Sequence, residues 1–406
     1  MSTPADTAWQ RLEELGTISD SPEHLVRTFL SPANLAAART VIGWMDGIGM
    51  HCDHAADGTV RGILDGADPE APPLLLGSHL DTVINAGKYD GALGIVTAIA
   101  ALETLRREEI TLPFPVHVLG FSDEEGVRFH ATYLGSRGIA GTLDGTAMEV
   151  TDVSGKSLCH AIDSEGWHEG ASTILYQPGK VRGYVEVHIE QGRVLEEAGE
   201  ALCAVSAIAG QTRVMARMTG RADHAGTTPM PLRRDALAGA AECIVAIESI
   251  ARSSDPLVAT VGRIEVLPGA SNSVPSSAAF TIDIRHPEDA ARVSAVAEIQ
   301  NTCAAVASHR GLVFEWNIVQ ETDAVPCDPV LTESLCKATG NPRLLASGAG
   351  HDGVAVSAIA PIAMIFVRCR GGLSHHPDEF ASQEDVAASV DALVRFLKTL
   401  ATSDHA

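Results

Sequence analysis

The chain has 406 residues, 45% of them hydrophobic, and its 29 basic and 52 acidic residues give a formal net charge of −23. This length exceeds what one hydrophobic core usually serves, so two domains are expected. The acidic balance without a basic block argues against nucleic acid or an anionic membrane as a partner, no apolar run approaches the roughly 18–20 residues that span a bilayer, and the N-terminus lacks the basic start and apolar stretch of a secretory signal.

The first half of the chain alternates between strand-like and helix-like segments. Leu74-Leu75-Leu76 is predicted as a buried strand that runs into His79, and residues 92–107 as a helix with apolar residues at helical spacing. Residues 116–121 and 184–189 are predicted as two further strands. This alternation predicts an α/β domain with a mostly parallel mixed sheet, in which functional side chains gather beyond the carboxyl ends of the strands.

The pattern changes after about Gln211. Residues 212–219 and 280–285 alternate between apolar and polar side chains, and an alanine-rich helix is predicted between them, from about 234 to 250. This predicts an inserted α+β domain with one face of its sheet covered, after which the α/β character returns. The predicted bounds are 1–210 and 327–406 for the α/β domain and 211–326 for the insert.

The eight cysteines include no Cys-x-x-Cys pair, so neither a zinc finger nor a thioredoxin-like site is indicated. Several lie among apolar residues, as Cys243 does in Ala241-Glu242-Cys243-Ile244-Val245. We therefore expect buried free thiols and a reducing, cytoplasmic location.

Four short segments, each next to a strand-like run, carry imidazoles and carboxylates, which are the ligands that hydrolytic metal ions take. They are Gly77-Ser78-His79-Leu80-Asp81-Thr82 with Lys88-Tyr89-Asp90-Gly91, then Asp123-Glu124-Glu125-Gly126, then Val187-His188-Ile189-Glu190-Gln191-Gly192, and last Leu373-Ser374-His375-His376-Pro377. A lone histidine is more often a core or surface residue than a ligand. The joint occurrence of all four segments instead predicts a two-metal hydrolase.

Two aspartates near His79 suit such a site. Asp81, two residues after His79, can accept a hydrogen bond from the second nitrogen of that imidazole. Asp90 precedes Gly91 and a predicted helix, so it can bridge two ions, cap the helix, or do both.

The adjacent Glu124 and Glu125 end an apolar strand, although an exposed acidic loop is the common explanation for such a pair. A metal ion lowers the pKa of a bound water toward about 7. One glutamate can therefore bind metal while its neighbour takes the proton of the water and passes it to the leaving nitrogen.

These segments resemble the hydantoinase/carbamoylase-type amidases, which include allantoate amidohydrolases, N-carbamoyl-L-amino acid hydrolases, β-ureidopropionases and ureidoglycolate amidohydrolases, within the aminoacylase-like clan of two-metal exopeptidases. The resemblance covers nearly the whole chain, and Asp123–Phe129 and His188–Gly192 are more specific to this branch than to the clan. It also rests on His224-Ala225-Gly226-Thr227-Thr228-Pro229-Met230 and Ser347-Gly348-Ala349-Gly350-His351-Asp352.

The resemblance implies a homodimer, a lid and dimerisation role for the insert, and two divalent metal ions per subunit, zinc or manganese, with cobalt or nickel as alternatives. It implies these roles: His79 and His188 on one metal, Glu125 and His375 on the other, Asp90 bridging them, and Glu124 as general base.

The resemblance further implies that His224 of the partner subunit's small domain stabilises the oxyanion. The implied substrate contacts are Gln191, Asn272, Arg285 and Gly350, with Asn272 and Arg285 on the substrate carboxylate. The fork of Arg285 can hold a carboxylate through two hydrogen bonds. The alternatives are a surface pair of Arg285 with Asp283 or Glu265, a plain turn residue at 272 and a loop histidine at 224.

The implied reaction is hydrolysis of the ureido carbon–nitrogen bond of a small anionic ureido or N-carbamoyl acid, with release of ammonia. Allantoate is the first expectation and an N-carbamoyl-L-amino acid the second. Two other classes stay open: an aminoacylase- or dipeptidase-like amide hydrolase, and a catalytically silent binding protein on the same scaffold. The silent protein would have a broken site, whereas the five ligands and the base are all present here.

Overall fold

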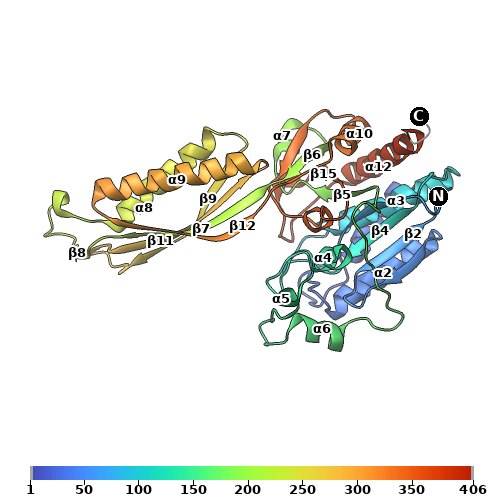
Figure 1. Ribbon diagram of the computed structural model, residues 1–406, viewed down its shortest axis with the longest axis horizontal. Helices are drawn as coiled ribbons and strands as arrows, with labels where there is room; N and C mark the ends of the chain where they lie inside the picture. The colour runs from blue at the N-terminus through green and yellow to red at the C-terminus, as the bar shows by residue number, and fades with distance from the viewer. Residues whose placement is uncertain (1–2, 404–406) are drawn as a thin grey trace. The chain divides into compact units, whose positions relative to one another are not determined.

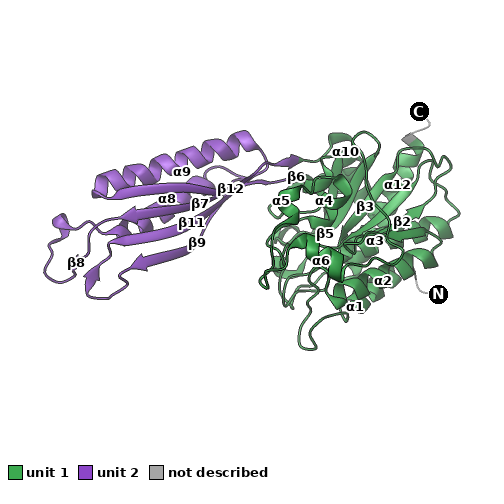
Figure 2. Cartoon of the chain, turned by 60° about the horizontal axis from the view of Figure 1, so that its bottom comes forward, with its two compact units in different colours: residues 1–206, 326–406 green, residues 207–325 purple. Residues whose placement is uncertain are grey.

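The computed structural model describes residues 3–403, and the chain divides into two compact units. Unit 1 comprises Met1–Ser206 and Pro326–Ala406, and unit 2 comprises Ala207–Val325 (Figure 2). The bounds expected from the sequence, 1–210 with 327–406 and 211–326, lie within a few residues of these. The insertion of unit 2 between two parts of unit 1 leaves the segments with candidate metal ligands together in unit 1.

Unit 1 is built on a mixed sheet, as the sequence predicted, and this sheet has nine strands among the described residues. Its four central strands are parallel neighbours, in the order β4 (Val116–Phe121), β3 (Leu74–His79), β5 (Gly183–Ile189) and β15 (Ile362–Val367). Nearly every residue of these strands is buried. Burial on both faces explains why they appear in the sequence as continuous apolar runs rather than alternating ones.

The outer strands are largely antiparallel to their neighbours. They are β1 (His51–His54), β2 (Val60–Leu64), β6 (Leu202–Ile208), β13 (Val325–Pro326) and β14 (Leu344–Ser347). The longer helices of unit 1 are α1 (Pro4–Leu15), α2 (Pro32–Gly47), α3 (Ala92–Arg107), α10 (Pro329–Thr339) and α12 (Gln383–Ser403). The shorter ones are α4 (Leu134–Ala140), α5 (Gly145–Met148), α6 (Leu158–Glu165), α7 (Val194–Ala198), α11 (Gly353–Val356) and the 3₁₀ turn η2 (Arg370–Gly372).

Helix α3 lies in the core of unit 1, between the sheet and helices α1 and α12 (Figure 1). It can approach the sheet closely because it presents small residues there. A side chain at Gly94 would come within 2.5 Å of the Val187 carbonyl oxygen and 2.7 Å of the Ser78 Cβ. The close packing holds the beginning of α3, and Asp90 just before it, at the carboxyl ends of β3 and β5.

Unit 2 is an antiparallel sheet with two helices on one face (Figures 1 and 2). Its strands are β12 (Val313–Thr322), β7 (Gly210–Thr219), β11 (Ser277–His286) and β9 (Val258–Leu267), in this order; its helices are α8 (Ala236–Arg252) and α9 (Asp289–Arg310). A short pair, β8 (Asp223–His224) and β10 (Ser273–Val274), and the 3₁₀ turn η1 (Met230–Leu232) complete it.

Alternate residues of β7 and β11 are buried, as the sequence pattern predicted, because the helices cover only one face of the sheet. Helix α8 begins at Ala236, two residues after the expected start, since the Asp235 carboxylate accepts a hydrogen bond from the Ala238 N–H and caps it.

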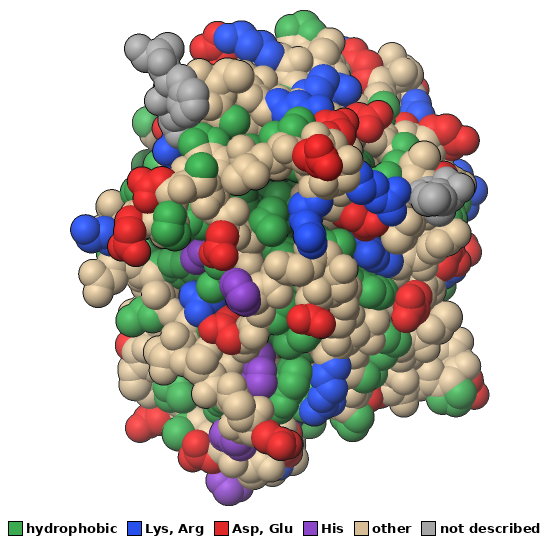
Figure 3. Space-filling model, turned by 90° about the vertical axis from the view of Figure 1, so that its right-hand side faces the viewer, with side chains coloured by type: hydrophobic (Ala, Val, Ile, Leu, Met, Phe, Trp, Pro, Cys, Tyr) green, Lys and Arg blue, Asp and Glu red, His purple; other side chains and the backbone are tan. Residues whose placement is uncertain are grey.

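Acidic and basic side chains are interspersed on the face of the molecule that Figure 3 shows. Over the face in Figure 3, Lys and Arg lie among Asp and Glu and do not gather in one patch. Among the helices that the structure describes, none combines the length and the apolar character needed to cross a bilayer.

Phe280→Ala should destabilise unit 2. The Phe280 ring on β11 is fully buried among the apolar side chains of the sheet and of α8 and α9. Truncation removes apolar contacts and leaves a cavity, at a cost of about 3–5 kcal/mol. Urea unfolding, with hydrogen exchange of the β11 amides as the local probe, measures the loss. Thr281→Ala, the neighbouring residue on the opposite face, is the matched control; equal losses for the two variants would contradict this packing.

Candidate metal centre

The candidate ligands lie where the four central strands of unit 1 end. His79 is the last residue of β3, and His188 is the last but one of β5. Glu124 and Glu125 follow β4, and the segment after β15 leads to His375. Because β4, β3, β5 and β15 are parallel neighbours, their carboxyl ends meet at one edge of the sheet. Residues up to about 300 positions apart in the sequence therefore meet there.

Asp90 is the buried carboxylate around which three imidazoles gather. Its Oδ1 lies 3.4 Å from Nε2 of His79 and 3.0 Å from Nε2 of His188, and its Oδ2 lies 3.4 Å from Nε2 of His375. Burial alone would raise the pKa of Asp90, but hydrogen bonds from the three histidines outweigh it and hold that pKa well below its usual value. Asp90 is therefore an ionised carboxylate with its two oxygens turned to different histidines.

The described residues include four candidate groups of metal donors, and two of them share Asp90. The other two groups are His79, Glu124 and Glu125, and Glu186, His188 and His351. Of the two sets that share Asp90, one is Asp90 with His79 and His188, the other is Asp90 with Glu125 and His375, and within each set the donor atoms lie within 4.8 Å of one another. In the second set, Nε2 of His375 is 3.4 Å from Oε1 of Glu125. Imidazole and carboxylate donors gathered in this way fit a divalent ion in each set, with Asp90 able to contribute one oxygen to each.

The two imidazoles of the first set are oriented by bonds on their other nitrogen. Nδ1 of His79 is 3.1 Å from the Asp81 carbonyl oxygen and 3.3 Å from the Asp81 carboxylate. Nδ1 of His188 is 3.0 Å from the Ile189 carbonyl oxygen. These acceptors hold a proton on Nδ1, so a metal ion would take the place of the Nε2 proton that now faces Asp90, as is usual for metal-bound histidines.

Gly91 is required by the position of His79. It has a φ of 67°, and a Cβ there would lie 2.5 Å from the His79 ring. Only glycine combines this backbone conformation with the absence of a side chain. Gly91 also occupies the cap position of α3, so the alternative role of Asp90 as the helix cap is wrong. The side chain of Asp90 therefore does not cap the helix and faces the three histidines instead.

Asp81 fixes the two glutamates as well as His79. Its carboxylate accepts hydrogen bonds from the backbone N–H of Glu124 at 2.9 Å and of Glu125 at 3.2 Å. Burial raises the pKa of Glu124 well above its usual value and raises the pKa of Glu125 to about 7. Such raised pKa values are typical of carboxyl groups that hold and release protons at neutral pH.

Sequence reasoning did not single out Glu379 and Ser374, which hold the Asp90 loop. Oε1 of Glu379 accepts the backbone N–H groups of Tyr89 and Asp90 at 2.9 and 3.0 Å. The Ser374 hydroxyl lies 2.9 Å from both Oδ2 of Asp90 and Oε2 of Glu379. Ser374 belongs to the last motif and Glu379 stands two residues after it, so their nearness to His375 in the sequence was the available signal.

Gln191 and Gly350, two of the expected substrate contacts, are both in unit 1. Nε2 of Gln191 donates to Oδ2 of Asp90 at 3.0 Å and to Ser374 at 3.1 Å, so this side chain reaches the second set of donors. Gly350 lies in the turn before His351, a buried imidazole whose ring centroid is 4.4 Å from that of His188. Burial lowers the pKa of His351 well below its usual value, so its ring is neutral. This neutral imidazole beside the site was not predicted from the sequence.

His224, Asn272 and Arg285 lie in unit 2, at two different places. His224 and Asn272 are neighbours at the β8–β10 pair, where the Ala225 N–H donates to the Asn272 carbonyl oxygen at 3.0 Å. The exposed His224 ring accepts backbone N–H groups on Nδ1, which leaves the proton on Nε2.

Arg285 is near the other end of β11, eight residues from Ser277 or roughly 26 Å at about 3.3 Å per residue. The β8–β10 pair continues beyond the Ser277 end of the sheet (Figure 1). One copy of unit 2 therefore does not bring Asn272 and Arg285 together. The Arg285 Nε lies 2.7 Å from Asp283, the surface pair named as an alternative.

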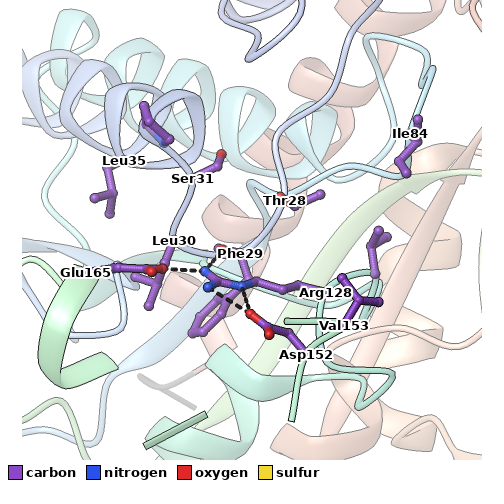
Figure 4. A pocket seen from close by; sticks show the side chains of 12 residues that line it. Thr28, Phe29, Leu30, Ser31, Leu35, Ile84, Arg128, Asp152, Val153 and Glu165 are labelled. Atoms are coloured by element: carbon purple, nitrogen blue, oxygen red, sulfur yellow. Dashed lines mark hydrogen bonds and ion pairs between the residues drawn. The ribbon is translucent and has the colours of Figure 1, made fainter. Parts of the chain in front are cut away.

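A separate pocket of about 870 Å³ lies beside the loops that follow β3 and β4 (Figure 4). It is lined by Thr28, Phe29, Leu30, Ser31, Pro32, Leu35, Ile84, Val127, Arg128, Asp152, Val153 and Glu165. No expected ligand or substrate contact is among these residues. Arg128 binds Glu165 at 2.7 Å and Asp152 at 3.1 Å, so its positive charge is paired and it ties the loop after Glu125 to the α5–α6 region.

The chain is similar to proteins of one family. The model of peptidase family M20/M25/M40 matches residues 75–399. An allantoate deiminase of Arabidopsis thaliana is 40% identical over 97% of this chain and 82% of its own length. An N-carbamoyl-L-amino acid amidohydrolase of Geobacillus stearothermophilus is 38% identical over 98% of both. The crystal structure of a hydantoinase/carbamoylase family amidase from Burkholderia multivorans has a TM-score of 0.90 at 29% identity, over 98% of both chains.

Divalent ions should stabilise the metal-stripped protein more as pH rises. A hydrogen bond to Asp90 raises the pKa of His375 to about 9, above its usual 6.5, and burial raises that of Glu125 to about 7, above 4.5. A group whose pKa is raised by folding stabilises the fold below its unfolded pKa and loses this contribution as pH rises through the folded value. The stripped protein should therefore lose stability between about pH 5 and 9, while metal ions take the place of the protons.

Thermal melts at pH 6 and 8.5, with and without manganese or zinc, measure the effect. His375→Ala should reduce the metal-dependent rise in Tm, whereas His376→Ala should not, because His376 is directed to Asp378 rather than to Asp90. The same rise at both pH values, or equal effects of the two substitutions, would contradict the assignment.

Proposed function

The chain belongs to peptidase family M20/M25/M40, and we propose that it hydrolyses a ureido carbon–nitrogen bond of a small ureido or N-carbamoyl acid and releases ammonia. Allantoate is the first candidate substrate and an N-carbamoyl-L-amino acid the second, since relatives named for both cover nearly the whole chain. The observation that carries the proposal is the buried Asp90, shared by two sets of donors, with the buried Glu124 beside them.

The proposed cofactor is a pair of divalent ions, zinc or manganese, with cobalt or nickel as alternatives. His79 and His188 would hold one ion, Glu125 and His375 the other, and Asp90 would bridge them. Ions at this position supply a Lewis acid for the substrate carbonyl and lower the pKa of water. The imidazole and carboxylate donor set is compatible with all four metals, so it supports the pair without selecting the element.

Glu124 is the proposed general base. The residue is 8% exposed and its backbone N–H is held by Asp81, so Glu124 has a fixed backbone beside the donors and little water around it. With a pKa raised by burial, it can take a proton during attack on the carbonyl and return it to the departing nitrogen.

From unit 2, Asn272 and Arg285 are proposed to hold the substrate carboxylate and His224 to stabilise the oxyanion. The Nε2–H of His224 can donate a hydrogen bond to a substrate, because Nδ1 of the same ring already accepts two backbone N–H groups. Asn272 is next to His224, whereas Arg285 is at the other end of the sheet. A single copy of unit 2 therefore cannot bring both residues to one substrate. Two copies can supply both, which supports a homodimer with His224 acting across the interface.

We propose a cytoplasmic location because of the oxidation state of the cysteines. All eight are free thiols, and five of them are buried. This usage is typical of a reducing compartment. The partners we propose are a second copy of the chain and a small anionic substrate, without nucleic acid or membrane.

Glu124→Gln should abolish ammonia release, since the amide cannot take a proton. The assay uses metal-stripped protein reloaded with manganese or zinc, and offers allantoate, N-carbamoyl-L-amino acids, β-ureidopropionate and an N-acetyl amino acid. We expect a loss of at least about 100-fold in kcat. Glu197→Gln, on an exposed glutamate paired with Arg193, is the matched control and should keep wild-type activity. Cleavage of the N-acetyl amino acid without ammonia from any ureido acid would replace the proposal with an aminoacylase.

Mixing two inactive variants should restore activity if His224 acts across a dimer. One variant is Glu124→Gln and the other is His224→Ala, and they are unfolded and refolded together so that subunits exchange. In the mixed dimer, one site has an intact Glu124 and receives His224 of the partner subunit. Random pairing then gives about a quarter of the wild-type activity. No activity in the mixture, with dimers present by light scattering, would place His224 in its own subunit's site.

A further inference from the structure

Tyr133 has a backbone conformation that is rare for an aromatic residue. Its φ of 63° and ψ of 31° put it in the left-handed region, just before helix α4. A bulky side chain in that region is strained, and such residues gather at functional sites because the surrounding structure holds them there. The neighbours of Tyr133 are therefore informative.

The backbone of Tyr133 is tied to the proposed general base. Its N–H donates to the carbonyl oxygen of Glu124 at 3.0 Å, and the N–H of Gly135 donates to that of Asp123 at 3.3 Å. The beginning of α4 is thus fastened to Asp123 and Glu124 in the loop after β4. A shift of Tyr133 would move the backbone of Glu124 with it.

The side chain of Tyr133 reaches the Gly350 turn. A Cβ built on Gly350 would lie only 1.9 Å from the Tyr133 hydroxyl oxygen and 3.0 Å from the ring carbon that carries it. The phenol therefore fills the space of a side chain at 350. The turn is also held by Ser347, whose hydroxyl lies 2.7 Å from Nε2 of the buried His351 and accepts the Ala349 N–H at 3.2 Å.

We propose that Tyr133 is a positioning residue that fixes the Gly350 turn against the Glu124 segment and so sets how the substrate is held beside the base. The inference rests on the proposed function, in which Glu124 is the base and Gly350 contacts the substrate. Tyr133 joins the two: its amide holds one and its phenol meets the other. This contact requires glycine at position 350, since any larger residue would displace the phenol.

Four variants test the contact, with KM, kcat and Tm measured for each. Tyr133→Phe keeps the ring and the backbone but loses the hydroxyl. It should raise KM about tenfold and change kcat less than about twofold, because a looser turn weakens substrate and transition state alike. Gly350→Ala should raise KM further, since the methyl group and the hydroxyl claim the same space. The control is Gly348→Ala in the same turn, where a Cβ would meet nothing within 4 Å.

The double variant Tyr133→Phe/Gly350→Ala decides the outcome. If the phenol and residue 350 share one space, removing the hydroxyl makes room for the methyl, and KM returns toward that of Tyr133→Phe. The proposal is overturned if the two effects multiply, if Gly350→Ala behaves like Gly348→Ala, or if Tyr133→Phe lowers Tm with no change in KM. The cycle uses whichever carbon–nitrogen substrate the wild type cleaves, so a failure of the ureido acids alone would end the proposed function and leave this test intact.

Discussion

The buried carboxylate of Asp90, facing three histidines, is the constraint on which the rest of unit 1 depends. An ionised carboxylate removed from water needs partners of opposite charge, and here these come from histidines on three separate segments. The Asp90 loop is fixed by Glu379 from beyond the last strand, and the close approach of His79 requires glycine at 91. Protons on the imidazoles and metal ions are alternative ways to balance the same charge, which couples metal binding to pH.

The sheet gives these residues their common location. Four parallel strands end side by side, and each supplies or precedes one part of the candidate site: His79 and His188 lie on strands, and Glu124, Glu125 and His375 lie in the segments that follow strands. A single carboxylate, that of Asp81, orients the His79 ring and accepts the backbone N–H groups of both Glu124 and Glu125. Tyr133 extends the same scaffold from the Glu124 segment to the Gly350 turn.

Much of this could be predicted from the sequence, and the limits have physical reasons. Strand-end motifs predicted His79, Asp90, Glu125 and His188 at one edge, because parallel strands bring their ends together. The link from Asp81 to Glu124 spans 43 residues and runs through a backbone N–H, which leaves no mark on residue type. Tyr133 could not be found, because local propensity disfavours an aromatic residue with positive φ and only tertiary contacts hold it there. The observed start of a helix differs from the predicted one by a residue or two where a capping side chain such as Asp235 sets it.

The most direct test of the central claim is the number of metal ions bound per subunit. Protein reloaded with manganese or zinc and freed of excess ions can be measured by inductively coupled plasma mass spectrometry, for the wild type, Asp90→Asn and the exposed control Asp378→Asn. A shared carboxylate predicts two ions in the wild type and in the control, and at most one in Asp90→Asn, because an amide has only one oxygen to offer. One ion in the wild type, or two retained in Asp90→Asn, would contradict it.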